Sequence, residues 1–237
     1  MRLPPALRRR LARWRRTACE ALGSARYSRP SLHEIDRKLE RHLNFDGGFF
    51  VEAGANDGYT VSNTYYFEKL RGWSGVLVEP VPALAAECRR NRRGRVFEAA
   101  LVAAAGPGDT VELHFAGLMS TVAGALGDEA VTAGHVAHGL AAQGLAGSYR
   151  LRVPARTLTA MLDEAGVTRE IDLLSLDIEG GEPAALRGLD FHRHAPRFIC
   201  VEARARAEID ALLTGRYAVA EVLAESAAYQ DVLYQRR

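Results

Sequence analysis

Acidic side chains and glycines gather in the segment EAGANDG, residues 52–58, at the end of an apolar stretch. Gly54 and Gly58 permit a tight turn close to a ligand, because a residue without a Cβ atom adopts unusual backbone angles at low cost. The spacing is GxxxG and not the GxGxxG of dinucleotide-binding turns, and Asp57 would repel a pyrophosphate at that place. The same carboxylate would suit the ammonium and sulfonium groups of S-adenosylmethionine, so the turn favours a cationic cofactor.

A second acidic residue lies at the end of the next apolar stretch, VLVEP. Glu79 comes 21 residues after Gly58. An acid about 20 residues beyond a glycine turn, at the end of the second strand, is placed to bind ribose hydroxyls. The alternative is a glutamate exposed at a strand end, but the offset from the glycine turn favours ribose binding.

A third acidic group, SLDIEGGE, begins within the apolar stretch at residues 171–177. Asp177 stands where open parallel sheets bind their ligands, at the carboxyl edge and beside the first strand. Glu179 and Glu182 follow at once, and Glu182 also fits a favourable charge near the N-terminus of the next helix. We therefore assign a functional role to Asp177 and a structural one to Glu182.

Alternating strand and helix patterns must position these acidic groups. The strand stretches are apolar on both faces and are followed by helix patterns, which predicts a mostly parallel α/β sheet with helices on both faces. The structure of residues 116–148, rich in glycine and alanine, is not indicated, and a mobile cap is one interpretation. The predicted strands are FFVEAGA (49–55), SGVLVEP (74–80), VFEAALV (96–102), IDLLSLD (171–177) and RFICVEA (197–203), with a closing pair at 217–225 and 229–237.

The motifs GANDG, SNT, VEP and LSLDIEG occur in an order that resembles the FkbM-type family of S-adenosylmethionine-dependent methyltransferases, over residues 49–202. The resemblance implies a Rossmann-like seven-stranded methyltransferase sheet, mostly parallel with an antiparallel last strand and helices on both faces. It also implies an O-methyltransferase that acts on a hydroxyl of a sugar, glycolipid or natural-product acceptor. The implied cofactor contacts come from Glu52, Gly54, Asn56, Asp57 and Glu79, to which the turn and the strand end add Gly58 and Asp177.

The chain departs from this family at one place that matters for the acceptor. After ICVE the family usually reads His-Asn, whereas this chain has Ala203 and Arg204. Residues 116–148 also match the family poorly, apart from LMSTV, which is similar to its Leu-Ser-Gly turn. The acceptor contacts of the family are therefore not carried over to this pair.

Methyl transfer to an alcohol needs a base within hydrogen-bond reach, because the acceptor oxygen must lose a proton as it attacks. Asp177 is the first candidate and Glu179 the second, while His135 or His138 could swing in from the cap. Alternatively, Asp177 and Glu179 hold a Mg²⁺ ion that acidifies the hydroxyl. The sequence does not separate a base from a metal ligand.

Residues 1–30 are expected to form a basic amphipathic extension, followed by the methyltransferase domain over residues 31–237. The extension carries a net charge of +8 and the remainder −6, so an anionic partner is expected at the N-terminus. Its apolar stripe either packs on the body or lies in an anionic membrane surface. The alternative is a disordered arm, or one that touches nucleic acid non-specifically; no specific nucleic-acid partner is indicated. The stripe consists of Leu3, Leu7, Leu11, Trp14, Ala18 and Leu22.

Two other function classes compete with methyl transfer. An NAD(P)-dependent oxidoreductase would use a similar sheet, but Asp57 in the glycine turn opposes its pyrophosphate. A membrane-associated binding module without catalysis would leave the acidic strand ends without a role.

The three cysteines have no CxxC spacing, which indicates neither a disulfide framework nor a zinc site. No apolar run approaches the ~20 residues of a membrane span. We therefore expect a cytoplasmic protein, either free or peripheral on the inner membrane face. The sequence indicates neither the oligomeric state nor the identity of the acceptor.

Overall fold

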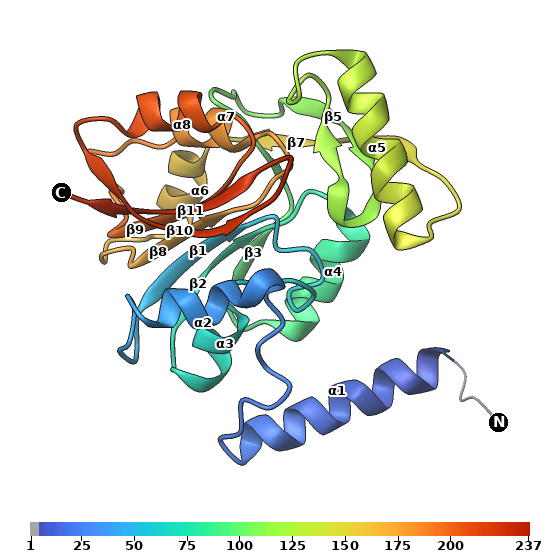
Figure 1. Cartoon of the computed structure of the whole chain (residues 1–237), viewed down its shortest axis with the longest axis vertical. Coiled ribbons are helices and arrows are strands. Elements are labelled where there is room, and N and C mark those ends of the chain that lie inside the picture. The colour runs from blue at the N-terminus through green and yellow to red at the C-terminus, as the bar shows by residue number, and fades with distance from the viewer. Residues whose placement is uncertain (1–4) are drawn as a thin grey trace.

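A computed structural model describes residues 5–237, and seven of its strands form one central sheet (Figure 1). In chain order these strands are β1 (Phe49–Ala53), β2 (Ser74–Val78), β3 (Arg95–Phe97), β8 (Leu173–Leu176), β9 (Phe198–Ala203), β10 (Tyr217–Glu225) and β11 (Gln230–Arg236). Across the sheet their order is β10-β11-β9-β8-β1-β2-β3. β1 pairs in parallel with β2 and β8, whereas β11 runs antiparallel to both β9 and β10. The expected mostly parallel sheet with an antiparallel last strand is confirmed.

Helices cover both faces of this sheet. Successive strand residues point to opposite faces, so each face has its own apolar side chains that a layer of helices buries. Along β1, Val51 and Ala53 belong to the core on one side and Phe50 to the core on the other. All three side chains are buried, as expected for a central strand of a parallel sheet. The first side is covered by α6 (Leu158–Glu164), α7 (Glu182–Arg187) and α8 (Arg206–Leu213), and the second by α2 (Ile35–Glu40), α3 (Tyr65–Leu70) and α4 (Pro82–Asn91).

A smaller four-stranded sheet stands beside the central one (Figure 1). The sequence predicts a single strand over residues 96–102, and this prediction is wrong. β3 ends at Phe97, and the chain then leaves the central sheet to pair with another strand. Both halves of the stretch are apolar, so its composition does not reveal the break. The strands of the smaller sheet are β4 (Ala100–Leu101), β5 (Thr110–Phe115), β6 (Thr121–Val122) and β7 (Tyr149–Arg156).

The glycine- and alanine-rich region at residues 116–148 contains the 3-10 turn η2 (Gly117–Met119) and the helix α5 (Glu129–Gln143). Asp128 caps the start of α5, where its side chain accepts a hydrogen bond from the backbone of Ala130. The helix ends at a glycine in the left-handed conformation. This region packs beside β5 and supplies part of the wall of the cavity described below.

The N-terminal helix α1 (Pro5–Ala21) lies outside the layers of the body (Figure 1). A 3-10 turn, η1 (Leu32–Glu34), leads from the following segment into α2. Leu3, which belongs to the predicted apolar stripe, lies outside the described residues. Within residues 5–237, no helix has both the length and the apolar character needed to cross a membrane. The predicted domain boundary near residue 30 stays a prediction.

Candidate active site

A cavity of about 490 Å³ opens at the carboxyl ends of β1, β2 and β8, where open parallel sheets bind their ligands. Its volume lies in the range of small-molecule sites. The sheet edge supplies most of its polar residues, and the cap, η1, α2 and the loops after β1 and β10 supply other parts of the wall. The residues that bear on its chemistry are Gly54, Asn56, Glu79, Asp177 and Glu202 from the sheet edge and His138 from α5.

Two glycines shape the turn after β1. Gly54 has φ +82°, and a Cβ atom there would lie 1.8 Å from the carbonyl oxygen of Asp177. Gly58 has φ +79°, and a Cβ atom there would lie 2.7 Å from Cγ of Arg92. Only glycine therefore lets the turn approach β8 on one side and α4 on the other.

Glu79 lines the cavity and holds the turn in place. Its Oε2 accepts a hydrogen bond of 2.8 Å from the backbone of Asn56, and its Oε1 accepts one of 2.9 Å from the backbone of Val81. Burial raises the pKa of Glu79 to about 7, although these two hydrogen bonds favour the charged form. Each carboxylate oxygen has a further lone pair with which to accept a hydrogen bond from a ligand.

Glu52 lies behind the cavity wall rather than in it. Its carboxylate accepts hydrogen bonds from the hydroxyls of Ser62 and Thr64, at 2.9 Å and 2.7 Å, and from Nη1 of Arg92 at 3.0 Å. The fully buried Arg92 also lies 3.2 Å from Glu68. Glu52 thus joins β1, the loop before α3 and the end of α4.

Arg92 is a residue that the sequence analysis missed. It lies in the run CRRNRRGR, residues 88–95, which has the composition of a solvated surface. Its burial depends on carboxylates that come from β1 and α3, far away in the sequence. No local pattern could have identified it.

Asp57 also lies outside the cavity wall. Its carboxylate accepts hydrogen bonds from the backbone of Tyr59 and Thr60, at 2.8 Å and 2.7 Å, and from the hydroxyl of Thr60 at 2.9 Å. This is the bonding of an Asx turn, which stabilises the loop. Of the expected cofactor residues, the structure brings Gly54, Asn56, Glu79 and Asp177 to the cavity and places Glu52, Asp57 and Gly58 behind it.

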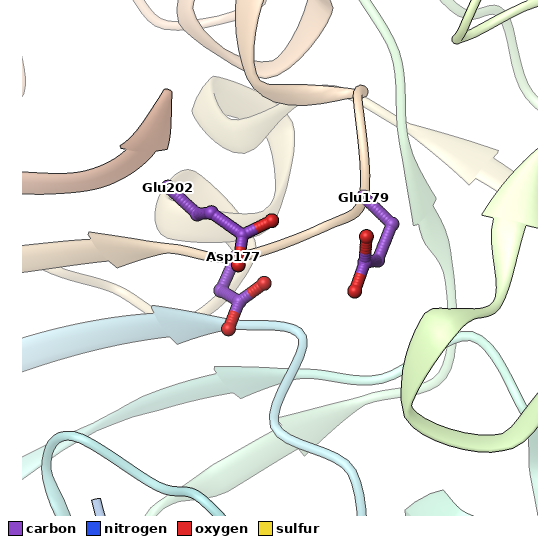
Figure 2. A group of neighbouring side chains, drawn as sticks. All are labelled: Asp177, Glu179 and Glu202. Atoms are coloured by element: carbon purple, nitrogen blue, oxygen red, sulfur yellow. The ribbon is translucent and has the colours of Figure 1, made fainter. Parts of the chain in front are cut away.

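Three of the carboxylates that line the cavity lie close to one another (Figure 2). Asp177 and Glu179 follow β8, Glu202 lies near the end of β9, and one oxygen of each lies within 4.8 Å of the others. Among residues 5–237, no group donates a hydrogen bond to the carboxylate of Asp177. Burial, followed by the charges of Glu202 and Glu179, raises its pKa well above the ordinary value. Burial and Glu179 likewise raise the pKa of Glu202 to about 8.

Arg204, at the position where the chain departs from the family pattern, binds this acidic cluster. Its Nη2 lies 2.6 Å from Glu179 Oε2 and 2.7 Å from Glu202 Oε1. His135 of α5 approaches the same Glu179 oxygen at 3.2 Å. Glu179 is therefore held by the guanidinium of Arg204, whereas Asp177 has no such partner among the described residues. His138, the other cap histidine, lines the cavity.

The three carboxylates do not fit a Mg²⁺ site in this arrangement. A magnesium ion needs carboxylate oxygens that are free to coordinate it, together with room for several waters. The guanidinium group of Arg204 already contacts two of the three carboxylates and supplies the compensating positive charge. We therefore derive no step through a metal ion.

Comparison with known proteins gives a family and several similar folds. The sequence model described as the methyltransferase FkbM domain matches residues 52–230. A TehB-like SAM-dependent methyltransferase from Corynebacterium glutamicum is 12% identical, with a TM-score of 0.44 over 99% of this chain and 100% of that chain. A mutant of MtNAS is 16% identical, with a TM-score of 0.41 over 86% of this chain and 59% of that chain. None of the curated proteins matches this chain.

Proposed function

The chain belongs to the FkbM methyltransferase family, and from this premise we propose that it transfers the methyl group of S-adenosylmethionine to a hydroxyl of a sugar, glycolipid or natural-product acceptor. The family match favours methyl transfer over the two alternatives, an NAD(P)-dependent oxidoreductase and a binding module without catalysis. The observation that carries the proposal is the carboxylate of Asp177. It lines the same cavity as Glu79, and no described residue donates a hydrogen bond to it.

Glu79 and the turn after β1 are proposed to hold the cofactor. The carboxylate of Glu79 accepts the ribose hydroxyls, while its bond to the backbone of Asn56 keeps the turn closed. Gly54 lets the backbone approach the cofactor beside Asp177. The sulfonium group supplies an electrophilic methyl and leaves as a neutral thioether, so the protein's main task is to align the acceptor.

Asp177 is proposed to accept the proton of the acceptor hydroxyl. A carboxyl group with a raised pKa is a better base near neutral pH than an ordinary one. Glu179 is less suited to this role because Arg204 holds its carboxylate. The cap, from which Met119 and His138 reach the cavity, would exclude water from the transfer.

The proposal is tested with isotope-labelled S-adenosylmethionine and a panel of sugars, glycolipids and hydroxylated natural products, with the methylated product identified by mass spectrometry. On the acceptor found, Asp177→Asn should lower turnover by about 10²–10⁴-fold. Glu87→Gln, which changes an exposed carboxylate on α4, is the control and should transfer at the wild-type rate. If Asp177→Asn retains full turnover, Asp177 is not the base. EDTA should leave the rate unchanged, because Arg204 supplies the positive charge at the acidic cluster.

A further inference from the structure

The helix α1 presents an apolar side to the solvent. Leu7, Leu11 and Trp14 follow one another at four- and three-residue steps, which places them on one side of the helix. Leu7 is 41% exposed, Leu11 42% and Trp14 69%. Leu22, directly after the helix, is 86% exposed. A stripe of this kind usually packs on the body of its own protein, and here it does not.

The opposite, polar side of α1 is the side that contacts the body. The guanidinium of Arg16 lies 3.6 Å from the centre of the Tyr59 ring, and Glu20 accepts a hydrogen bond of 2.9 Å from the hydroxyl of Tyr65. Arg16 comes nine residues after Leu7, about two and a half helical turns, and so lies on the far side of the helix. The contacts with the body therefore leave the apolar stripe outermost.

Arginines border this outward stripe on both sides. At the angular spacing of an α-helix, Arg8 and Arg15 lie along one border and Arg10 along the other, and all three are exposed. Residues 1–30 carry +8 and the rest of the chain −6. An anionic surface would attract the helix and repel the body, so the charge distribution selects both the contact and its orientation.

We propose that the outward side of α1 binds the surface of an anionic lipid bilayer. Leu7, Leu11 and Trp14 enter the boundary between headgroups and acyl chains, and the bordering arginines contact lipid phosphates. A second copy of the chain fits this side less well, because it would bring two arginine-rich borders together. Nucleic acid would attract the arginines but would leave the leucines and Trp14 in water. The inference is independent of the proposed methyl transfer, since it needs neither cofactor nor acceptor.

The fluorescence of Trp14 gives a direct test with the full chain. The only other tryptophan, Trp73, is buried in the core, so changes on addition of vesicles report on Trp14. Phosphatidylcholine vesicles with about 30 mol % phosphatidylglycerol should shift its emission to the blue, whereas pure phosphatidylcholine vesicles should not. Acyl-brominated lipids should quench it, and Trp14→Phe should remove the signal. Absence of a shift and of quenching on anionic vesicles would overturn the proposal.

Co-sedimentation with the same vesicles distinguishes binding of the stripe to lipid from its binding to a second copy of the chain. The double variant Leu11→Glu with Trp14→Glu should weaken vesicle binding by at least about tenfold. Val131→Glu, at an exposed apolar position of α5, is the matched control and should bind as the wild type does. Equal binding by the double variant would contradict the proposal. So would self-association that depends on this stripe without vesicle binding, which would identify a second copy as the occupant.

Discussion

The carboxylates behind the cavity wall and those of the acidic cluster have opposite surroundings. Yet Glu52 on β1 and Asp177 after β8 come from neighbouring strands. Around Glu52, each carboxylate oxygen accepts hydrogen bonds, and Arg92 bridges it to Glu68. Around Asp177, carboxylates face one another, and among the described residues none donates a hydrogen bond to its side chain. The first region has the features of a scaffold. The second holds unfavourable charge that a cationic ligand would relieve, as is common at functional sites.

The pKa shifts follow this difference. Burial is the largest influence on Glu68 and by itself would raise its pKa. The charges of Arg92 and Lys69 and hydrogen bonds from the backbone of Arg93 and Gly94 together outweigh it, so the pKa is lowered. At Asp177, burial and the charges of Glu202 and Glu179 act in the same direction and raise the pKa. Burial of a carboxylate is thus compensated at Glu68 and left uncompensated at Asp177.

We expect the largest loss of stability when the buried guanidinium of Arg92 is removed. Arg92→Met leaves Glu52 and Glu68 buried without their partner, and should lower the free energy of unfolding by about 3–5 kcal/mol. Urea unfolding measures the loss. Arg90→Met, which removes an exposed arginine of the same helix, should change stability little. A similar small effect of both variants would mean that the buried ion pairs do not hold this region together.

A smaller but more local effect is expected at the junction of the two regions. Gly54→Ala adds a Cβ atom 1.8 Å from the carbonyl oxygen of Asp177, and should both destabilise the fold and abolish cofactor binding. Gly72→Ala is the matched control, because Gly72 also has positive φ but no atom within 4 Å of the added Cβ. The control should lower the free energy of unfolding by only about 1–2 kcal/mol, the cost of a Cβ atom in the left-handed backbone conformation. Equal losses of stability in the two variants, measured by thermal unfolding, would contradict the predicted clash between the added Cβ atom and the carbonyl oxygen of Asp177.

The pH dependence of stability should report on the buried carboxylates of the acidic cluster. The pKa of Glu202 is raised to about 8 from an ordinary value of 4.5, so between these values the folded state holds a proton that the unfolded state has lost. The free energy of unfolding therefore falls as the pH rises through this window. Glu202→Gln should make the decline shallower by roughly 1–3 kcal/mol between pH 5 and pH 8, in urea titrations at fixed salt. A profile that rises with pH, or equal slopes for both proteins, would contradict this.

The smallest expected effect concerns the ribose contact. Glu79→Ala removes a carboxylate that lines the cavity and holds the backbone of Asn56 and Val81. It should weaken the binding of S-adenosylhomocysteine by about 1–3 kcal/mol, the cost of leaving buried polar groups without a partner. Calorimetric titration measures the change. Wild-type affinity in this variant would place the ribose elsewhere.

The sequence predicts the strand ends of this site well because they follow local patterns. The turn at residues 52–58, Glu79 and Asp177 come directly after apolar strands, and parallel pairing brings their carboxyl ends to one edge. Side-chain direction was less predictable, because Asp57 is taken up by backbone groups of its own loop. Glu52 is likewise held by partners that fold against it from other elements.

Long-range pairs account for most of what the sequence analysis missed. Arg204 stands 25 residues from Glu179 and binds it only because β9 lies next to β8. The outward direction of the α1 stripe depends on contacts of Arg16 with Tyr59, between residues that no periodicity links. A helical pattern identifies which residues share a side, but it does not say which side meets the body.

The most direct test of the account compares S-adenosylmethionine, which carries one more positive charge, with S-adenosylhomocysteine. Calorimetric titrations of both ligands between pH 6 and pH 8.5 would be made on the wild type and on Asp177→Asn. We predict that both ligands bind the wild type. The affinity ratio should shift toward S-adenosylmethionine as the pH rises and the acidic edge loses its protons, and Asp177→Asn should reduce that shift. Failure of both ligands to bind, or a ratio that does not change with pH in either protein, would contradict the claim that this edge receives a cationic methyl donor.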